Sequence, residues 1–463
     1  MKHKAIEKKL NPIDRSKPPK PGPANNVSFP RFFAKQFANG FKFFVVENHI
    51  LPIVSMGFVV RGGSGLDGNL PGLASMTSEL ITKGTKKRTA AEIAETIDYV
   101  GGSLSSNSSW DASEVFVSVL RNHLTTGIDL LQDVVLNATF PQEEIDRVKT
   151  QRIAAIQQLK ADPGYLAETR FTSVVFGNHP YGNPASGTEE SVKAMKREDL
   201  AELQKNSCAA DNSFMVFAGD ITPKEAEEYV SRYFGKWKRR RKSCSIPLAM
   251  PNHSNGKVVI VDKPDAVQSA LRIGGVGIAR NDKNYLKAFV MNTLLGGYFS
   301  SRINMNLRES HGYTYGGRSI FDARILPGLF AVSADVRNEV TGETISEVLK
   351  ELNRIRETLP SKEELEMVKK YLDGLFPIQL ETPQQVARRV IALELYHLPK
   401  AYYKRYRENI RRINAGDIRS SAVKYIPEKL AIVLSGNSKE ISSALGKFGK
   451  VEIVDAEGRK LSD

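Results

Sequence analysis

The chain repeats itself at a long period, and this repeat limits its possible folds more than any other feature. Each copy contains an apolar run that ends in glycine just before a helix start, and the same short motifs follow in the same order. Corresponding landmarks lie about 210 residues apart, which indicates two copies of one structural unit. The matching segments are VVRGG (59–63) with RIGG (272–275), MVFAGDITPKE (215–225) with AIVLSGNSKE (431–440), and FGK (234–236) with FGK (448–450).

Each copy begins with strand-like segments and continues with helical patterns, which is typical of an α+β domain. The expected strands lie near 43–46, 53–60, 215–218, 258–262 and 271–278. The expected helices lie at 72–82, 89–100, 122–136 and 141–159 in the first copy and begin near 283, 300, 341 and 361 in the second. We therefore predict two homologous α+β domains of about 210 residues each.

The predicted domain boundaries follow from composition. We expect a flexible, basic, Pro-rich tail at 1–30, a first domain at 31–236, a basic linker at 237–255 and a second domain at 256–455. The formal charge is +14, of which the tail contributes +5 and KWKRRRK at 236–242 contributes +6. Since both segments look like solvated connectors, the basicity alone does not indicate a nucleic-acid-binding domain. Binding of RNA or a membrane surface through them stays an alternative.

Neither cysteine usage nor hydropathy points to a secreted scaffold or a membrane span. Only Cys208 and Cys244 are present, too few for a disulfide framework. No stretch reaches the roughly eighteen apolar residues that cross a bilayer, and the N-terminal segment has charges but no apolar signal-peptide core. We expect a soluble protein without a transmembrane segment, periplasmic if a signal was removed and otherwise cytoplasmic.

The segment PGLASMTSELITKGT at 71–85 predicts a helix that carries few possible metal ligands. Ser75 and Glu79 are four residues apart and would share a helix face. A serine hydroxyl is a poor Zn²⁺ ligand beside imidazole or thiolate, and one carboxylate cannot hold the ion alone. We therefore expect no metal and no cofactor in this chain.

This segment resembles the G-x-A-H-x-x-E-H motif, with its following K-G-T, of the pitrilysin/insulinase-type zinc peptidases, in their mitochondrial-processing-peptidase-like branch. The resemblance places the two histidine ligands on Ser75 and Glu79, the general base on Ser78, and a distal glutamate ligand on Ala155 or its neighbour Ala154. It covers residues from about 30 to 455 and includes GNHPYG at 177–182 and FGKW at 234–237. It implies antiparallel-rich sheets with helices packed on them, two domains forming a half-shell, and two half-shells enclosing a peptide chamber.

The second copy holds the best candidate for retained chemistry, GGYFSSRINMNLRESHGYTY at 296–315. A helix through Leu307 that ends at Gly312 would bring Arg308 and Tyr315 to the same place. In the resembled family, an Arg and a Tyr at this spacing hold the substrate carbonyl and the developing oxyanion at the zinc site. We therefore predict Arg308 and Tyr315 as catalytic residues. The alternative is that Arg308 pairs with a nearby carboxylate and Tyr315 packs within a sheet.

Other candidate residues carry weaker signals. His179 and His311 lack a second ligand at metal spacing, so we expect loop or turn roles for both. Ser75 and Ser78 have no nearby His or Lys base and are expected to be helix-surface or capping residues. The stretch 103–107 is similar to an edge strand that takes up peptide in active family members.

These expectations lead to a division of labour. The hypothesis is a non-zinc-binding subunit of a heteromeric zinc endopeptidase, as in some bacterial members of the family. A homologous partner subunit would carry the zinc, and the substrate would be a peptide or unfolded protein, without nucleic acid. The alternative is a catalytically inert structural or peptide-binding member of the family.

Overall fold

The computed structural model describes residues 27–239 and 256–461. Most of the predicted tail and linker, residues 1–26 and 240–255, lies outside the described residues. Trp237, which prediction placed in the linker, packs against Phe41 and Phe58 of the first half at ring distances of 5.6 and 5.8 Å.

The strands form two six-stranded sheets, one from each half of the chain. The first has the order β1-β2-β6-β3-β5-β4 and the second the order β12-β7-β11-β8-β10-β9. The strands of the first sheet are β1 (Phe33–Gln36), β2 (Lys42–Glu47), β3 (Ile53–Arg61), β4 (Ser103–Ser108), β5 (Ala112–Leu120) and β6 (Ser213–Gly219). Those of the second are β7 (Val258–Asp262), β8 (Gln268–Val276), β9 (Gly317–Asp322), β10 (Leu329–Arg337), β11 (Ala431–Gly436) and β12 (Val451–Val454).

The two sheets repeat the same strand pattern. In both, the inner parallel pair (β2 with β6, β7 with β11) is followed by three antiparallel pairings. The sheets differ at one edge, because β1 precedes its neighbour in sequence and runs antiparallel to it, whereas β12 comes from the C-terminal end and runs parallel. The prediction of two homologous α+β units with antiparallel-rich sheets is confirmed.

The eight predicted helices begin within about two residues of the predicted positions, in part because local capping defines several first turns. Capping boxes start several of the helices, including those at Thr89 with Glu92, Thr222 with Glu225, Ser361 with Glu364, and Asn414 with Asp417. The first half contains α1 (Leu73–Leu80), α2 (Ala90–Tyr99), α3 (Leu124–Asn137), α4 (Gln142–Leu159), α5 (Pro163–Phe176), α6 (Glu189–Ala194), α7 (Arg197–Ser207) and α8 (Pro223–Phe234). The second contains α9 (Tyr285–Asn292), α10 (Arg302–Asn304), α11 (Thr341–Glu357), α12 (Lys362–Ile378), α13 (Pro383–Leu395), α14 (Tyr406–Arg412), α15 (Ala415–Tyr425) and α16 (Ser438–Leu445).

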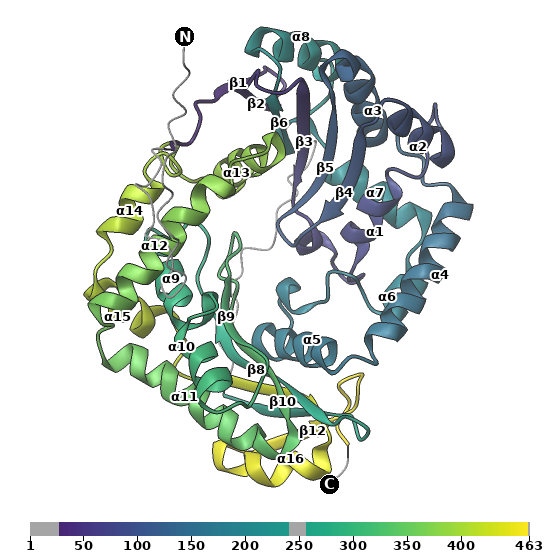
Figure 1. Cartoon of the computed structure of the whole chain (residues 1–463). Helices are drawn as coiled ribbons and strands as arrows, with labels where there is room; N and C mark the ends of the chain where they lie inside the picture. The colour runs from purple at the N-terminus through teal and green to yellow at the C-terminus, as the bar shows by residue number, and fades with distance from the viewer. Residues whose placement is uncertain (1–26, 240–255, 462–463) are drawn as a thin grey trace, which may run out of the picture.

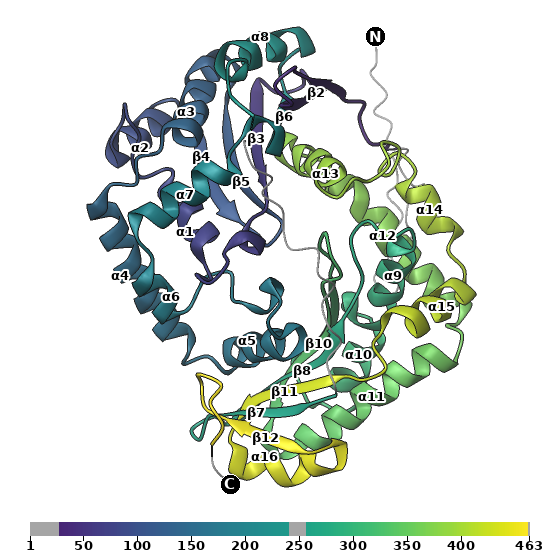
Figure 2. The same ribbon diagram turned by 180° about the vertical axis from the view of Figure 1, so that it is seen from behind.

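Each half lends one helix to the sheet of the other half. Helix α13 packs on β3 and β6 of the first sheet, and α5 packs on β8 and β11 of the second (Figures 1 and 2). The close approach of α13 is possible because Gly57 has no side chain, since a Cβ there would lie 3.0 Å from Cδ1 of Ile391. The exchange joins the two halves into the curved body of Figure 1, in agreement with the expected half-shell.

Ion pairs reinforce both exchanged helices. Glu394 of α13 accepts from Lys42 at 2.9 Å and from Arg61 of β3 at 2.5 Å. Glu168 of α5 accepts from Arg272 Nε of β8 at 2.7 Å. Within residues 27–239 and 256–461, no helix is both long and apolar enough to cross a membrane.

Candidate functional site

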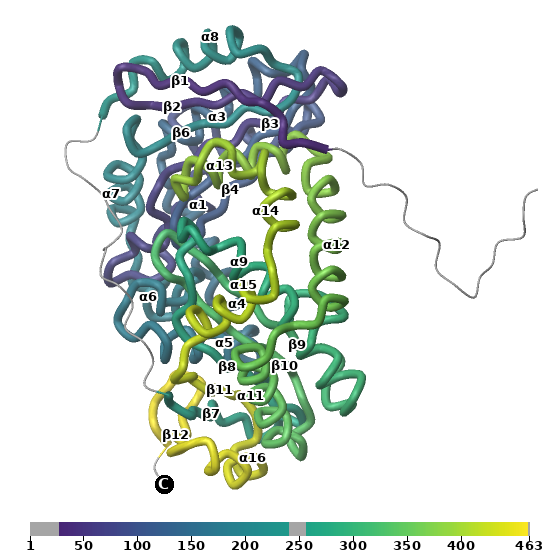
Figure 3. Tube along the Cα trace, turned by 90° about the vertical axis from the view of Figure 1, so that its left-hand side faces the viewer, coloured from purple at the N-terminus to yellow at the C-terminus, as the bar shows by residue number. Residues whose placement is uncertain are grey.

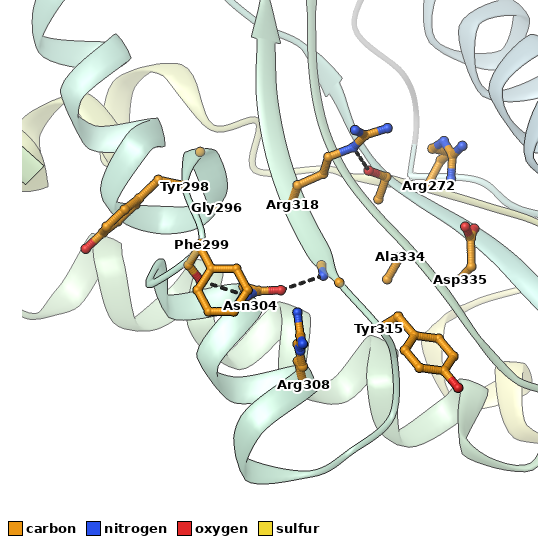
Figure 4. Close-up of a pocket in the computed structure, with 14 residues that line it drawn as sticks. Arg272, Gly296, Tyr298, Phe299, Asn304, Arg308, Tyr315, Arg318, Ala334 and Asp335 are labelled. Atoms are coloured by element: carbon orange, nitrogen blue, oxygen red, sulfur yellow. Dashed lines mark hydrogen bonds between the residues drawn. The ribbon is translucent and has the colours of Figure 1, made fainter. Parts of the chain in front are cut away.

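A cavity of about 480 Å³ opens beside the end of the second sheet and contains both predicted catalytic residues. Its wall is formed by the segment before α10, by the helix that follows α10, and by β9 and β10 (Figure 4). The lining includes Phe299, Asn304, Arg308, Tyr315 and Arg318. The structure therefore brings Arg308 and Tyr315 together at one open site.

Arg308 lies in the segment Met305–Ser310, which continues α10 as a π-helix. Such segments are rare and occur frequently at functional sites. The guanidinium carbon lies 4.9 Å from the centre of the Phe299 ring, and Nε lies 3.3 Å from Oε1 of Glu309. Both ionic side chains are more than 40% exposed, so the pair is weak and leaves the guanidinium accessible.

Tyr315 lies in the turn between this helix and β9. Gly312 has a left-handed backbone (φ 62°) and ends the helix, as the sequence predicts. Thr314 then fixes the turn, because its hydroxyl donates to the carbonyl of Asp335 at 2.8 Å and accepts from the backbone of Gly316 at 3.1 Å. The Tyr315 side chain is 92% exposed and has no hydrogen-bond partner in the described part of the chain. The alternative of a tyrosine packed within the sheet does not match this placement.

Asn304 connects the two sides of the cavity, and the sequence interpretation missed it. Its Nδ2 donates to the carbonyl of Phe299 at 2.7 Å, and its Oδ1 accepts from the backbone of Gly317 at 3.1 Å (Figure 4). The side chain is buried, so it fixes the Phe299 loop against the start of β9. Asn304 belongs to the segment 296–315 described above. Its partners depend on the tertiary structure, so no local sequence pattern could have identified its role.

The emptied metal motif forms α1 as predicted, and an arginine lies where two metal ligands are expected. Arg152 of α4 donates from Nη1 to Oγ of Ser75 at 3.2 Å and from Nη2 to Oε2 of Glu79 at 2.5 Å. The Arg152 side chain is 13% exposed. A bound dication at the same oxygens would face this permanent positive charge, so the residues present do not fit zinc.

The other positions of the motif have structural roles or point to solvent. The expectation of a helix-surface or capping role for Ser78 is wrong, because this residue is buried inside α1. Its carbonyl accepts from Oγ of Ser106 in β4 at 2.6 Å. Ala154 and Ala155 are exposed. Among residues 27–239 and 256–461, no group of three or more His, Cys, Asp or Glu side chains could hold a metal ion.

Asp67 fixes the start of α1. Its carboxylate accepts from the backbone of Gly72 at 2.7 Å and of Ala74 at 2.8 Å. Burial raises the pKa of Asp67 from 3.8 to about 7, although these two hydrogen bonds and the charge of Arg152 oppose the shift.

The remaining candidates lie away from the cavity. His179 Nδ1 accepts from the backbone of Tyr181 at 3.1 Å, which is a turn role, and His311 Nδ1 lies 3.0 Å from the carbonyl of Asn306. Strand β4 contains residues 103–107 and is the edge of the first sheet, with β5 as its strand neighbour.

Comparison with known families accounts for both halves of the chain. Residues 43–189 match the model of the insulinase family, peptidase family M16, and residues 194–372 match the peptidase M16 inactive domain. The chain belongs to the insulinase family. The family assignment confirms the resemblance drawn from the motifs. The inactive-domain match supports a catalytically inert member of this family.

Individual relatives are similar over most of their length. The uncharacterized zinc protease ML0855 of Mycobacterium leprae is 31% identical over 65% of this chain and 72% of its own. The non-peptidase homolog YmxG of Helicobacter pylori is 26% identical over 73% and 78%. Among solved structures, a peptidase M16 inactive domain from Pseudomonas fluorescens superposes with a TM-score of 0.83 at 24% identity, covering 88% of this chain and 98% of that one. The structural match shows the shared fold.

Proposed function

We propose that this chain is the non-zinc-binding subunit of a heteromeric zinc metalloendopeptidase that degrades peptides in a closed chamber. In this proposal, a homologous partner subunit supplies the zinc site, and Arg308 and Tyr315 reach across to it. The observation that carries the proposal is that both side chains line one open cavity with polar groups accessible, while Arg152 takes the place of metal in the same chain.

The two side chains have complementary chemistry for the proposed role. The Arg308 guanidinium offers forked donors with a permanent charge, and the Tyr315 phenol donates one hydrogen bond at neutral pH. Directed at a peptide carbonyl, these donors would stabilise the negative charge that develops on its oxygen. One such donor is typically worth about 3 to 4 kcal/mol in the transition state.

A second candidate is a catalytically inert peptide-binding member of the family. It is favoured by the open edge strand β4, whose exposed positions Ser103, Ser105 and Asn107 alternate along one face. An extended peptide could add to such an edge through backbone hydrogen bonds. This candidate gives no role to the exposed phenol of Tyr315, which is why we place it second.

The test is peptide hydrolysis by this chain alone, by an active-type family member from the same source, and by the two combined. We expect activity above that of the partner only in the mixture. Replacing Arg308→Ala or Tyr315→Phe should lower kcat about a hundredfold to a thousandfold while leaving complex formation intact. Arg337→Ala is a matched control, because Arg337 is an exposed arginine at the end of β10 outside the cavity lining.

Two outcomes would contradict the proposal. One is full activity of the complex after Arg308→Ala. The other is a stoichiometric amount of tightly bound zinc in this chain when purified alone.

A further inference from the structure

The positive charge of the folded body is concentrated in one segment. Residues 400–424 carry eight Lys or Arg against Glu408 and Asp417, a net charge of +6. Residues 1–30 and 236–242 contribute +5 and +6 to the total of +14. When these two segments and residues 400–424 are set aside, the rest of the chain carries −3. The excess positive charge of the folded part is therefore local to this segment and is not spread over the surface.

This segment covers one outer side of the second half. It comprises the turns after α13 and the helices α14 and α15, which lie at the rim in Figure 1 and face the viewer in Figure 3. Five of its cations are exposed and form no ion pair within the described residues. They are Lys400, Lys404, Arg405, Arg419 and Lys424, and we call them the basic face.

The nearby carboxylates are already paired with other cations. Asp373 of α12 binds Arg407 Nε at 2.8 Å and Arg411 Nη2 at 2.9 Å. Glu408 binds Arg412 at 2.5 Å, and Asp417 binds Lys287 of α9 at 2.7 Å. The pKa of Lys424 is raised by the Tyr425 hydroxyl and by Asp282, which accepts from that hydroxyl at 3.0 Å, although Asp282 and Lys424 form no direct ion pair. The other four cations of the basic face have no carboxylate partner within the described residues.

A second basic segment joins the protein at the same place. Residue Val27 begins the described N-terminal part, and its carbonyl accepts from Arg407 Nη1 of α14 at 3.3 Å. Phe29 packs on Tyr403 with ring centres 5.3 Å apart. The sequence preceding Val27 carries the net +5 noted above, and Val27, where it joins the described part of the chain, contacts α14.

The aromatic side chains of this region are directed inward. Tyr403 and Tyr425 are buried, and Tyr406 stacks on Phe376 at 4.9 Å. Recognition of single-stranded nucleic acid relies on accessible rings on which bases stack, and this face does not present them. Clusters of lysine and arginine on an exposed helical surface are instead sufficient for attraction to anionic lipid headgroups.

We propose that the basic face docks this protein on the surface of a membrane that contains anionic phospholipids. The inference is independent of the peptidase role, because the basic face and the Arg308 cavity share no residues. The basic face would attract the negatively charged lipid headgroups, and no helix would insert into the membrane. Binding should therefore weaken as salt is added.

The experiment is cosedimentation of the full-length protein with two kinds of vesicle, phosphatidylcholine alone and phosphatidylcholine with phosphatidylglycerol. We expect binding to the anionic vesicles only. The variant Lys404→Glu/Arg405→Glu/Arg419→Glu should bind them at least about tenfold more weakly. The control Lys86→Glu/Lys87→Glu/Lys205→Glu changes the net charge equally at exposed lysines of the first half and should retain most of the binding.

Three results would overturn the proposal. The first is no preference of the unaltered protein for anionic vesicles. The second is an equal loss in both charge-reversal variants, which would mean that net charge alone governs binding. The third is binding of single-stranded RNA that is tighter than vesicle binding and is lost in the basic-face variant, which would assign the face to nucleic acid.

Discussion

At the scale of single residues, the guanidinium of Arg152 binds the two side chains of α1 that stand where metal ligands are expected. Its two terminal nitrogens contact Ser75 and Glu79, and Nη1 also approaches the carbonyl of Ser186 at 3.4 Å. These contacts tie α1, α4 and the loop before α6 together at one point. An arginine can replace a structural cation in this way because its charge is permanent and its donors lie in a fixed plane.

Removing this side chain should destabilise the first half measurably. We expect Arg152→Ala to lower the free energy of unfolding by about 2 kcal/mol, since it breaks hydrogen bonds to a charged, partly buried group. Urea unfolding followed by tryptophan fluorescence measures the change. Arg147→Ala is the matched control on the same helix, because Arg147 is 44% exposed in its pair with Glu144 and should contribute under about 0.5 kcal/mol. Equal effects of the two substitutions would contradict a special role for Arg152.

The buried Asp67 gives the stability of the first half a definite pH dependence. Its pKa is raised to about 7 in the folded state, from 3.8 as the ordinary value, so the folded protein binds this proton more tightly than the unfolded chain. The resulting stabilisation is complete below pH 4 and is lost as the pH rises through about 7. We expect the stability difference between the unaltered protein and Asp67→Asn to decrease as the pH rises from 5 to 8.

Comparing urea midpoints of the two proteins across this range isolates Asp67, since all other titrating groups are common to both. A difference that is constant across this range would show that the carboxylate is ionised throughout in the folded protein, and one that grows with pH would contradict the raised pKa directly. The substituted asparagine does not titrate, and its amide group cannot accept from both backbone donors, so the variant should be the less stable protein at low pH.

The two candidate sites differ in how far the sequence could predict them. Arg308 and Tyr315 are seven residues apart, and a helix ended by Gly312 brings them to one place through local geometry. Arg152 contacts Ser75 and Glu79 across 77 and 73 residues. Because no local rule specifies a contact between α1 and α4, sequence patterns could identify the absence of the zinc ligands but not their replacement.

At the scale of secondary-structure elements, helix positions were predictable and helix partners were not. The helical pattern alone placed α4 at 141–159, against Gln142–Leu159 in the structure. The same pattern in α13 gives its apolar face but does not say which sheet it covers. The answer depends on shape, since Gly57 of β3 leaves the space that Ile391 fills.

The exchanged helix α13 should therefore contribute strongly to the stability of the first sheet. Ile391 is 3% exposed among residues of the first half, and we expect Ile391→Ala to cost about 3 kcal/mol. The same substitution at Ile378 of α12, which is 53% exposed, should change stability by under about 0.5 kcal/mol. Tryptophan fluorescence during urea unfolding is the measurement, because both tryptophans, Trp110 and Trp237, lie in the part of the chain that precedes the second sheet. A similar effect of the two isoleucine substitutions would show that α13 is only loosely attached.

At the scale of the whole molecule, the exchange of α5 and α13 makes each half depend on the other. If one half unfolds, the other loses the helix that covers one face of its sheet. A chain of two independent domains would unfold in two steps, whereas this arrangement favours one cooperative transition. The sequence repeat predicts two similar units but cannot reveal this dependence. A repeat indicates the structure of each copy, and it does not indicate that a helix of one copy covers the sheet of the other.

We expect the unfolding curves of the two halves to coincide. Trp237 packs on Phe41 and Phe58, so its fluorescence reports the first half. It is measured in a Trp110→Phe background, because Trp110 also contacts Arg324 of the second half. Hydrogen exchange of the backbone amides in β8 and β11 reports the second half. Both should give the same midpoint in urea, and Ile391→Ala should shift both midpoints together although the sheet on which the substituted side chain packs is the first one. The second half would behave as a separate domain if its amides stayed protected after the fluorescence change was complete.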